Sequence, residues 1–213
     1  MQRWDGEQTS PLRRGGIRSV LCGESCRVES HGNGEGVKVR DSPTGVLAGI
    51  LSGMQIQFGI VTVSDRASQG VYEDLGGPAL KKSGTERGWV VVEESVVPDD
   101  RSAIQRAIRQ CINRGAHLVL TTGGTGVSRR DVTPEAVKEI ADRELPGFGE
   151  AMRMKSLELT PNAILSRSLA VTVGSVLVIC LPGKPAGAVD CLGFVAGAIP
   201  HTVKVLQEVP TSC

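Results

Sequence analysis

The chain has 213 residues, which is enough for one well-packed domain with length to spare. Its net charge of +1 and its aromatic content of 3% disfavour a nucleic-acid partner, because such proteins usually carry a basic field or base-stacking side chains. No apolar run is long enough to span a bilayer and the N-terminus has no apolar signal segment, so we expect a cytoplasmic protein without a membrane partner.

Residues 1–53 differ in composition from the rest of the chain. Glycine, serine, arginine and acidic residues dominate this segment, and no helical or strand period persists in it. It is too polar to offset the entropy of ordering, so we predict a disordered N-terminal extension. Its acidic residues disfavour an organelle transit peptide. Met54 lies just before the first clear strand, so residues 1–53 could instead result from a start codon assigned too far upstream. We expect the folded domain over residues 54–213.

A regular alternation of strands and helices begins at Gln57. Residues 58–63 are an apolar, β-rich run that predicts a strand, followed by a polar loop over residues 64–70. A short helix is predicted over residues 77–84, and a second strand over residues 89–97.

The next segment has the spacing of an amphipathic helix. Asp99 or Asp100 can cap its start, and Gly115 is well placed to end it. The cysteine in its apolar stripe is expected to pack in the core, and the spacing of the six cysteines disfavours a zinc site. The stripe consists of Ile104, Ala107, Ile108, Cys111 and Ile112.

A third strand is predicted over residues 117–121. It runs into a loop of glycines, threonines, two arginines and an aspartate over residues 122–131. Thr133 is expected to be the N-cap of the following helix, with Pro134 at the first helical position. A further helix is expected over residues 149–159.

The last part of the chain predicts a hairpin and a C-terminal helix. Residues 171–173 and 176–179 flank a Gly-Ser turn, and residues 181–185 turn into an Ala- and Gly-rich helix that runs to the end. Strands that alternate with helices indicate an α/β sandwich with a mostly parallel central sheet, to which the hairpin adds a mixed-direction edge.

Four loops follow predicted strands and carry glycine, hydroxyl or charged residues. They cover residues 64–70, 98–101, 122–131 and 181–185. In open parallel sheets ligands bind beyond the carboxyl ends of the strands, so these loops are the expected rim of an active site.

The loop over residues 122–131 carries most of the functional signal. Its glycines let the backbone approach a ligand closely, and backbone N–H groups in such a turn can cradle phosphate oxygens. The two arginines would balance phosphate charge, and Asp131 is suited to a hard divalent cation. A Gly-Gly-Thr-Gly segment alone is more often only a tight turn, so this reading depends on the neighbouring motifs.

Together these motifs resemble a known family. The sequence is similar, over residues 57–208, to the Mog-type molybdopterin adenylyltransferases, which include the G domain of gephyrin and its plant counterparts. The motifs recur in the family's order. They are Val63-Ser64-Asp65-Arg66-Ala67-Ser68-x-Gly70, Thr122-Gly123-Gly124-Thr125-Gly126, Arg130-Asp131-Val132-Thr133-Pro134-Glu135, Pro146-Gly147-Phe148-Gly149, Leu165-Ser166-Arg167 and Leu181-Pro182-Gly183-x-Pro185.

The resemblance implies a three-layer α/β/α fold, a homotrimer and a Mg²⁺-dependent reaction. AMP passes from ATP to the terminal phosphate of molybdopterin, pyrophosphate is released, and a molybdenum insertase uses the product. Asp99 and Asp131 match the family's functional aspartates, and Asp131 would hold the metal. The expected substrate-binding residues are Ser64, Asp65, Thr122, Gly123, Gly124, Thr125, Gly126, Ser166, Arg167, Pro182, Gly183 and Lys184.

Other interpretations stay open at the level of sequence. Asp99 can simply cap a helix, Asp65 can form a turn, and Arg167 and Lys184 can be solvated cations. A non-catalytic molybdopterin-binding or scaffold module of the same fold is the alternative function, and a Moa-type relative with the same chemistry is a third possibility.

Overall fold

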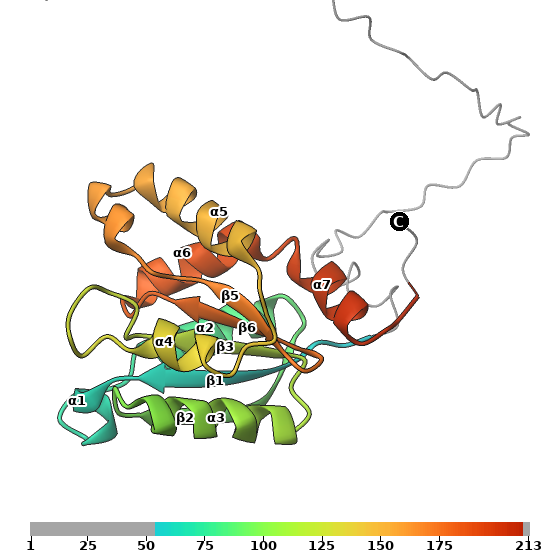
Figure 1. Cartoon of the computed structure of the whole chain (residues 1–213), viewed down its shortest axis with the longest axis horizontal. Coiled ribbons are helices and arrows are strands. Elements are labelled where there is room, and N and C mark those ends of the chain that lie inside the picture. The colour runs from blue at the N-terminus through green and yellow to red at the C-terminus, as the bar shows by residue number, and fades with distance from the viewer. Residues whose placement is uncertain (1–53, 211–213) are drawn as a thin grey trace, which may run out of the picture. The chain divides into compact units, whose positions relative to one another are not determined.

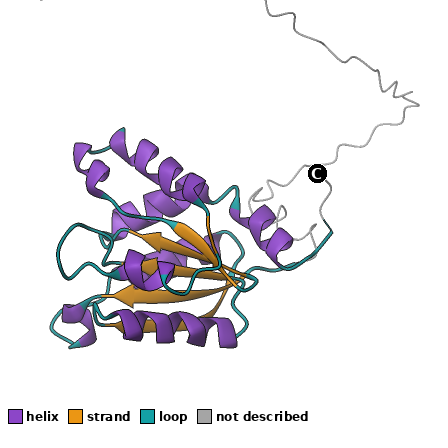
Figure 2. Ribbon diagram, viewed as in Figure 1, coloured by secondary structure: helices purple, strands orange, loops and turns teal. Residues whose placement is uncertain are grey.

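The computed structural model describes residues 54–210, so the predicted extension over residues 1–53 lies outside the described residues. Helices and strands alternate along the chain, as Figures 1 and 2 show. The elements are β1 (Gln57–Val63), α1 (Asp65–Ser68), α2 (Gly76–Glu86), β2 (Val90–Val97), α3 (Arg101–Asn113), β3 (Leu118–Thr122), α4 (Thr133–Lys138), β4 (Arg143–Glu144), α5 (Pro146–Leu157), the 3₁₀ helix η2 (Pro161–Leu165), β5 (Ala170–Val173), β6 (Val176–Leu181), α6 (Pro185–Val195) and α7 (Ile199–Leu206).

The strands form one six-stranded sheet in the order β2-β1-β3-β6-β5-β4. The first four strands in this order are mutually parallel, while β5 pairs antiparallel with both β6 and β4. The mostly parallel sheet and its mixed-direction edge are therefore confirmed. The parallel strands all end at the same edge, so the loops that follow β1, β2, β3 and β6 meet there.

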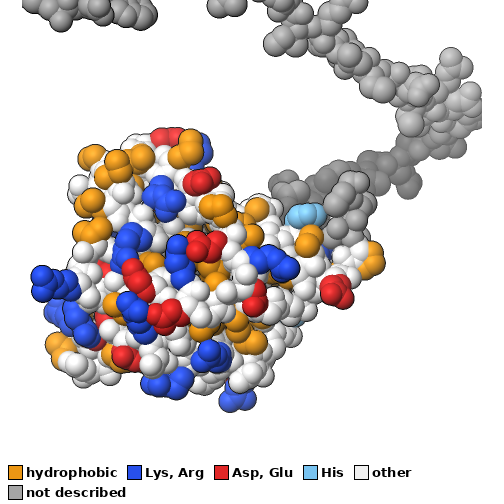
Figure 3. Space-filling model, viewed as in Figure 1, with side chains coloured by type: hydrophobic (Ala, Val, Ile, Leu, Met, Phe, Trp, Pro, Cys, Tyr) orange, Lys and Arg blue, Asp and Glu red, His pale blue; other side chains and the backbone are white. Residues whose placement is uncertain are grey.

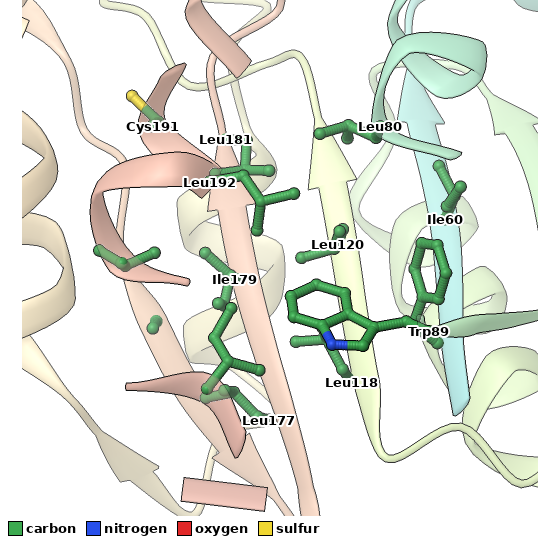
Figure 4. Packing of buried hydrophobic residues seen from close by; sticks show 14 of the residues in the cluster. Ile60, Leu80, Trp89, Leu118, Leu120, Leu177, Ile179, Leu181, Cys191 and Leu192 are labelled. Carbon is green, nitrogen blue, oxygen red and sulfur yellow. The ribbon is translucent and has the colours of Figure 1, made fainter. Parts of the chain in front are cut away.

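Helices cover both faces of the sheet and bury two separate cores. On one face Ile60, Leu120 and Ile179 pack against α2, α5, α6 and α7 (Figure 4). On the other face Val61 and Val119 pack against α3 and α4. Side chains of a strand alternate between its faces, so each central strand supplies both cores. This arrangement confirms the three-layer α/β/α fold.

An aromatic pair closes the first core near the start of β2. The rings of Phe58 and Trp89 meet edge to face, with centroids 6.0 Å apart. Behind them, a Cβ atom at Gly84 of α2 would overlap the Phe58 ring, so only a glycine lets this helix lie so close to β1. Phe58 and Trp89 are therefore structural residues, away from the carboxyl edge of the sheet.

Several boundaries differ from the sequence prediction. Helix α5 begins at Pro146 rather than at residue 149, because Pro146 is suited to the first turn of a helix. The C-terminal helix is two helices, α6 and α7, bent by 69° relative to each other. The short elements α1, β4 and η2 were not predicted.

The prediction that Thr133 caps α4 is wrong. Thr133 is already helical, and Val132 occupies the N-cap position without a side-chain cap. The Thr133 hydroxyl instead donates to the carbonyl oxygen of Gly123, 2.9 Å away, because the glycine loop packs directly over the start of α4. Asp100 is the N-cap of α3 and accepts from the N–H of Ala103 at 2.8 Å.

Within residues 54–210, no single helix is long and apolar enough to cross a membrane. Helices α6 and α7 pass such a test only when they are joined across their bend. Their apolar residues Leu192, Val195, Ile199 and Val203 are buried against the sheet, so this composition serves the core.

The cysteines of the described part are packing residues. Cys111 lies fully buried on the inner face of α3, as predicted, and Cys180 and Cys191 are buried unpaired thiols. Burial raises the pKa of the Cys111 and Cys180 thiols to about 12. Thiols that stay protonated are poor nucleophiles and poor metal ligands.

Candidate active site

The four predicted loops meet around a cavity of about 470 Å³ at the carboxyl edge of the sheet, which we call the main cavity. It opens between the ends of β1, β3 and β6 and the start of α2 and α6. The predicted site residues that line it are Ser64, Asp99, Thr122, Gly123, Gly124, Asp131, Gly183 and Lys184. These residues come from four separate segments, so the predicted clustering of the loops is confirmed.

Glycine at position 123 is required where the loop leaves β3. Gly123 has a φ of +103°, and a Cβ atom there would overlap the carbonyl oxygen of Val63. The Gly123 N–H donates to the carbonyl oxygen of Leu181 at 3.2 Å, and the Thr122 hydroxyl donates to that of Pro182 at 2.8 Å. The loop is therefore held against both β1 and β6.

The backbone after Gly123 presents unused donors. Within residues 54–210, the N–H groups of Gly124, Thr125, Gly126 and Val127 have no hydrogen-bond acceptor. Backbone N–H groups are strong donors that are normally paired, and successive free ones form a concave site for anions. This arrangement suits phosphate oxygens, and phosphate binding by this loop stays a prediction.

Asp65 and Asp99 connect the loops after β1 and β2. The N–H of Asp65 donates to Oδ2 of Asp99 at 3.0 Å, and the N–H of Asp99 donates to Oδ1 of Asp65 at 3.1 Å. Arg130 donates to Oδ2 of Asp65 through Nε at 3.0 Å and through a terminal nitrogen at 2.5 Å. Asp65 thus lies behind Asp99 and does not line the main cavity.

The two aspartates have opposite pKa shifts. The hydrogen bonds from Arg130 lower the pKa of Asp65, because they stabilise its charged form. Burial raises the pKa of Asp99, and the nearby charges of Asp65 and Asp131 add to this effect. One oxygen of Asp99, Oδ1, has no hydrogen-bond partner among the described residues and is available to a cation.

Asp131 lies at the boundary between two cavities. Its Oδ2 accepts from the N–H of Ser128 at 2.7 Å, and its Oδ1 has no partner in the described part of the chain. Asp131 lines the main cavity and also a second cavity of about 350 Å³, which we call the arginine cavity. The arginine cavity is lined by Arg101, Val127, Ser128, Arg129, Asp131, Val132, Glu135 and Arg167.

Arg167 holds the loop over residues 122–131 in place. Its side chain donates to the carbonyl oxygens of Gly126 and Asp131, both at 2.7 Å, and pairs with Glu135. Its own N–H donates to the carbonyl oxygen of Thr125 at 3.0 Å. Burial acts to raise the pKa of Glu135, but hydrogen bonds and the Arg167 charge lower it overall. The contacts of Arg167 are thus with the protein, and its role toward substrate stays a prediction.

The remaining predicted residues lie around these cavities in different ways. The Ser166 hydroxyl donates to that of Ser168 at 2.9 Å, outside the main cavity. Gly183 packs against Gly123, where a Cβ atom would lie 3.2 Å from the Gly123 Cα. Lys184 is the single cation among the residues that line the main cavity. Its position suits an anionic substrate.

Sequence reasoning missed Asp74 and Tyr72, which also line the main cavity. The Asp74 carboxylate accepts from the Thr62 hydroxyl at 2.8 Å and from the N–H groups of Gly76 and Gly77 at 2.9 and 3.0 Å. It therefore fixes the start of α2 to the end of β1. An aspartate shortly before a Gly-Gly-Pro helix start was the available signal.

Comparisons with known proteins agree with this geometry. The family model described as a probable molybdopterin binding domain matches residues 59–201. The chain is 46% identical over 154 residues to a molybdopterin adenylyltransferase of Helicobacter pylori (strain J99), covering 71% of this chain and 88% of that protein. It is 44% identical over 173 residues to the molybdopterin adenylyltransferase of Escherichia coli (strain K12), covering 71% and 86%.

A solved structure shares the fold. The molybdopterin biosynthesis enzyme MoaB of Thermus thermophilus aligns with a TM-score of 0.69 at 38% identity, covering 74% of this chain and 100% of that one.

Proposed function

The chain belongs to the family of the probable molybdopterin binding domain and, within it, to the molybdopterin adenylyltransferases. We propose that the site at the carboxyl edge of its sheet transfers AMP from ATP to the terminal phosphate of molybdopterin. The position of Asp131 carries this proposal. Asp131 borders both cavities and lies beside a loop with unused N–H donors, as a transfer between two phosphates requires.

The nucleophile in this reaction is a phosphate oxygen of molybdopterin, so the protein needs no activated side chain. This agrees with the lining of the main cavity, which contains no cysteine or histidine. The one lining serine, Ser64, accepts from the N–H of Ala67 at 3.2 Å as the cap of α1. The protein's contribution is to align two anions that repel each other and to stabilise the charge that develops.

The proposed Mg²⁺ fits the donors of the main cavity. Glu73, Asp74, Asp99 and Asp131 line it against the single cation Lys184, so a polyphosphate requires a cation to bind there. Mg²⁺ is commonly bound by one or two carboxylates together with substrate phosphates. Within residues 54–210, no group of three or more histidine, cysteine, aspartate or glutamate side chains is arranged to hold a metal ion by itself. Asp131 would hold the ion with Asp99 beside it, and the ion would neutralise phosphate charge.

A homotrimer is part of the proposal. Large apolar side chains are exposed on α5 and η2, where hydrophobic atoms gather at one end of the molecule (Figure 3). Exposed apolar patches of this kind mark protein contacts, and a second copy of the chain would cover them. A mass measurement by light scattering tests the trimer. The exposed residues are Met154 and Leu157 of α5, Leu159 of the loop that follows it, and Ile164 and Leu165 of η2.

The product would pass to a molybdenum insertase in the cytoplasm. The described thiols Cys111, Cys180 and Cys191 are unpaired, in keeping with a reducing compartment. Cell fractionation and co-purification with an insertase test these two points.

The direct test is incubation of the full chain with molybdopterin, ATP and Mg²⁺, followed by detection of adenylyl-molybdopterin and pyrophosphate. We expect both products only when all three components are present. Tight molybdopterin binding without pyrophosphate release would instead identify a non-catalytic binding module.

A further inference from the structure

The arginine cavity is separated from the main cavity by Asp131 and has the opposite balance of charge. Three arginines line it against two carboxylates, whereas four carboxylates line the main cavity against one lysine. An anion without its own cation is therefore better accommodated on the arginine side.

The three arginines are not equally available. Arg167 is bound to Glu135 and to two carbonyl oxygens, and Arg101 pairs with Glu139 at 2.5 Å. Arg129 has no hydrogen-bond or ion-pair partner within residues 54–210, and its side chain is exposed. It is the free cation of this cavity among the described residues.

The lining also limits the kind of ligand. It contains no aromatic side chain on which a purine or pterin ring could stack, and its polar groups are arginines, a serine and carboxylates. The N–H of Val127 faces no protein acceptor in the described part of the chain. Guanidinium groups and free backbone N–H groups together bind phosphate oxygens.

We propose that the arginine cavity binds the β- and γ-phosphates of ATP and then the released pyrophosphate, with Arg129 as the residue that binds them. The proposal rests on the proposed adenylyl transfer. In that step a molybdopterin phosphate oxygen forms a bond to the α-phosphorus, and the bond from the α-phosphorus to the bridging oxygen breaks. Pyrophosphate leaves with that electron pair, on the side of Asp131 away from the main cavity.

Calorimetric titration of the full chain with pyrophosphate, without Mg²⁺ and without molybdopterin, tests the site, because the arginine cavity should bind an anion that carries no cation of its own. We expect Arg129→Ala to weaken pyrophosphate binding about tenfold, the effect of losing one charge-assisted contact, and Arg129→Glu to weaken it further. Arg109→Ala is the matched control, because Arg109 is exposed on the outer side of α3 and away from both cavities. Inorganic phosphate should bind more weakly than pyrophosphate.

The outcomes separate this site from the proposed function. If adenylyl-molybdopterin forms but Arg129→Ala binds pyrophosphate as tightly as the unchanged chain, the cavity assignment is wrong and the function stands. If no product forms while Arg129→Ala still weakens pyrophosphate binding, the cavity is an oligophosphate site and the proposed reaction is wrong. Equal binding of phosphate and pyrophosphate would also overturn the site.

Discussion

The carboxylates of Asp65 and Asp99 each accept a hydrogen bond from the backbone N–H of the other residue, at 3.1 and 3.0 Å. This reciprocal pair fixes the loop after β1 to the loop after β2. It also places two negative charges close together, of which only Asp65 is paired with Arg130. The second charge, on Asp99, faces the main cavity, so Asp65 positions a group that it also repels.

This relationship predicts a shift in pH dependence for Asp65→Asn. Burial raises the pKa of Asp99, and the charges of Asp65 and Asp131 add to this effect. Activity that requires the charged form of Asp99 should therefore begin to fall, as the pH decreases, at a higher pH than an ordinary aspartate would set. Asparagine keeps the acceptor for the Asp99 N–H but removes one repelling charge. The acid limb of the rate profile should therefore move to lower pH.

Rates measured from about pH 4 to about pH 8 at saturating ATP and Mg²⁺ test this prediction. Asp190→Asn serves as the control, since Asp190 is exposed on α6 and outside the main cavity. An acid limb that stays in place in Asp65→Asn would show that Asp65 acts only as a hydrogen-bond acceptor.

Asp131→Asn should lower the rate of adenylyl-molybdopterin formation by at least about 100-fold, the loss typical of removing a group that stabilises transition-state charge. The variant should remain folded, because the asparagine oxygen can still accept from the Ser128 N–H. Product formation and thermal unfolding are the two measurements. An undiminished rate in the folded variant would remove Asp131 from the mechanism.

The elements that place the site could be predicted from local patterns. The strands β1 and β3 are short apolar runs, and the apolar stripe of α3 has a clear helical period. Because strands alternate with helices, a mostly parallel sheet was expected, and the loops that follow its strands meet at one edge. The strand β4 has only two residues and owes its pairing to β5, so it has no signal of its own.

Contacts over long sequence separations could not be predicted in this way. Thr133 has the residue type of a helix cap, yet its hydroxyl donates to the carbonyl oxygen of Gly123 in the glycine loop. Arg167 reaches Gly126, 41 residues earlier, and no local pattern indicates that partner. Sequence reasoning named both residues, but their contacts depend on which segments pack together.

Gly123→Ala should destabilise the protein strongly. The residue has a φ of +103°, which costs other residues roughly 1–2 kcal/mol, and the added methyl would also overlap the Val63 carbonyl oxygen. Gly174→Ala is a matched control, because Gly174 also has positive φ, +57°, but has open space around its Cβ position. In denaturant unfolding, Gly123→Ala should lose more stability than Gly174→Ala; equal losses would mean that the loop moves away from β1 freely.

Arg167→Ala should remove about 2 kcal/mol of stability at neutral pH, since half-buried carbonyl and carboxylate oxygens lose a charged donor. Part of this loss depends on pH. The lowered pKa of Glu135 means that its pairing contributes stability above its unfolded-state pKa of 4.5, and that this contribution disappears as pH falls through the lower folded-state value.

The stability difference between the unchanged chain and Arg167→Ala should therefore narrow in acid without vanishing, because the carbonyl contacts of Arg167 do not titrate. Arg167→Lys separates the two effects. Lysine retains the charge beside Glu135 but cannot also reach the carbonyl oxygens of Gly126 and Asp131 with a guanidinium fork. Arg167→Lys should therefore restore the pH-dependent part of the stability but not the part that comes from the carbonyl contacts. A stability difference that is the same at neutral and acid pH would assign the whole effect to the carbonyl contacts.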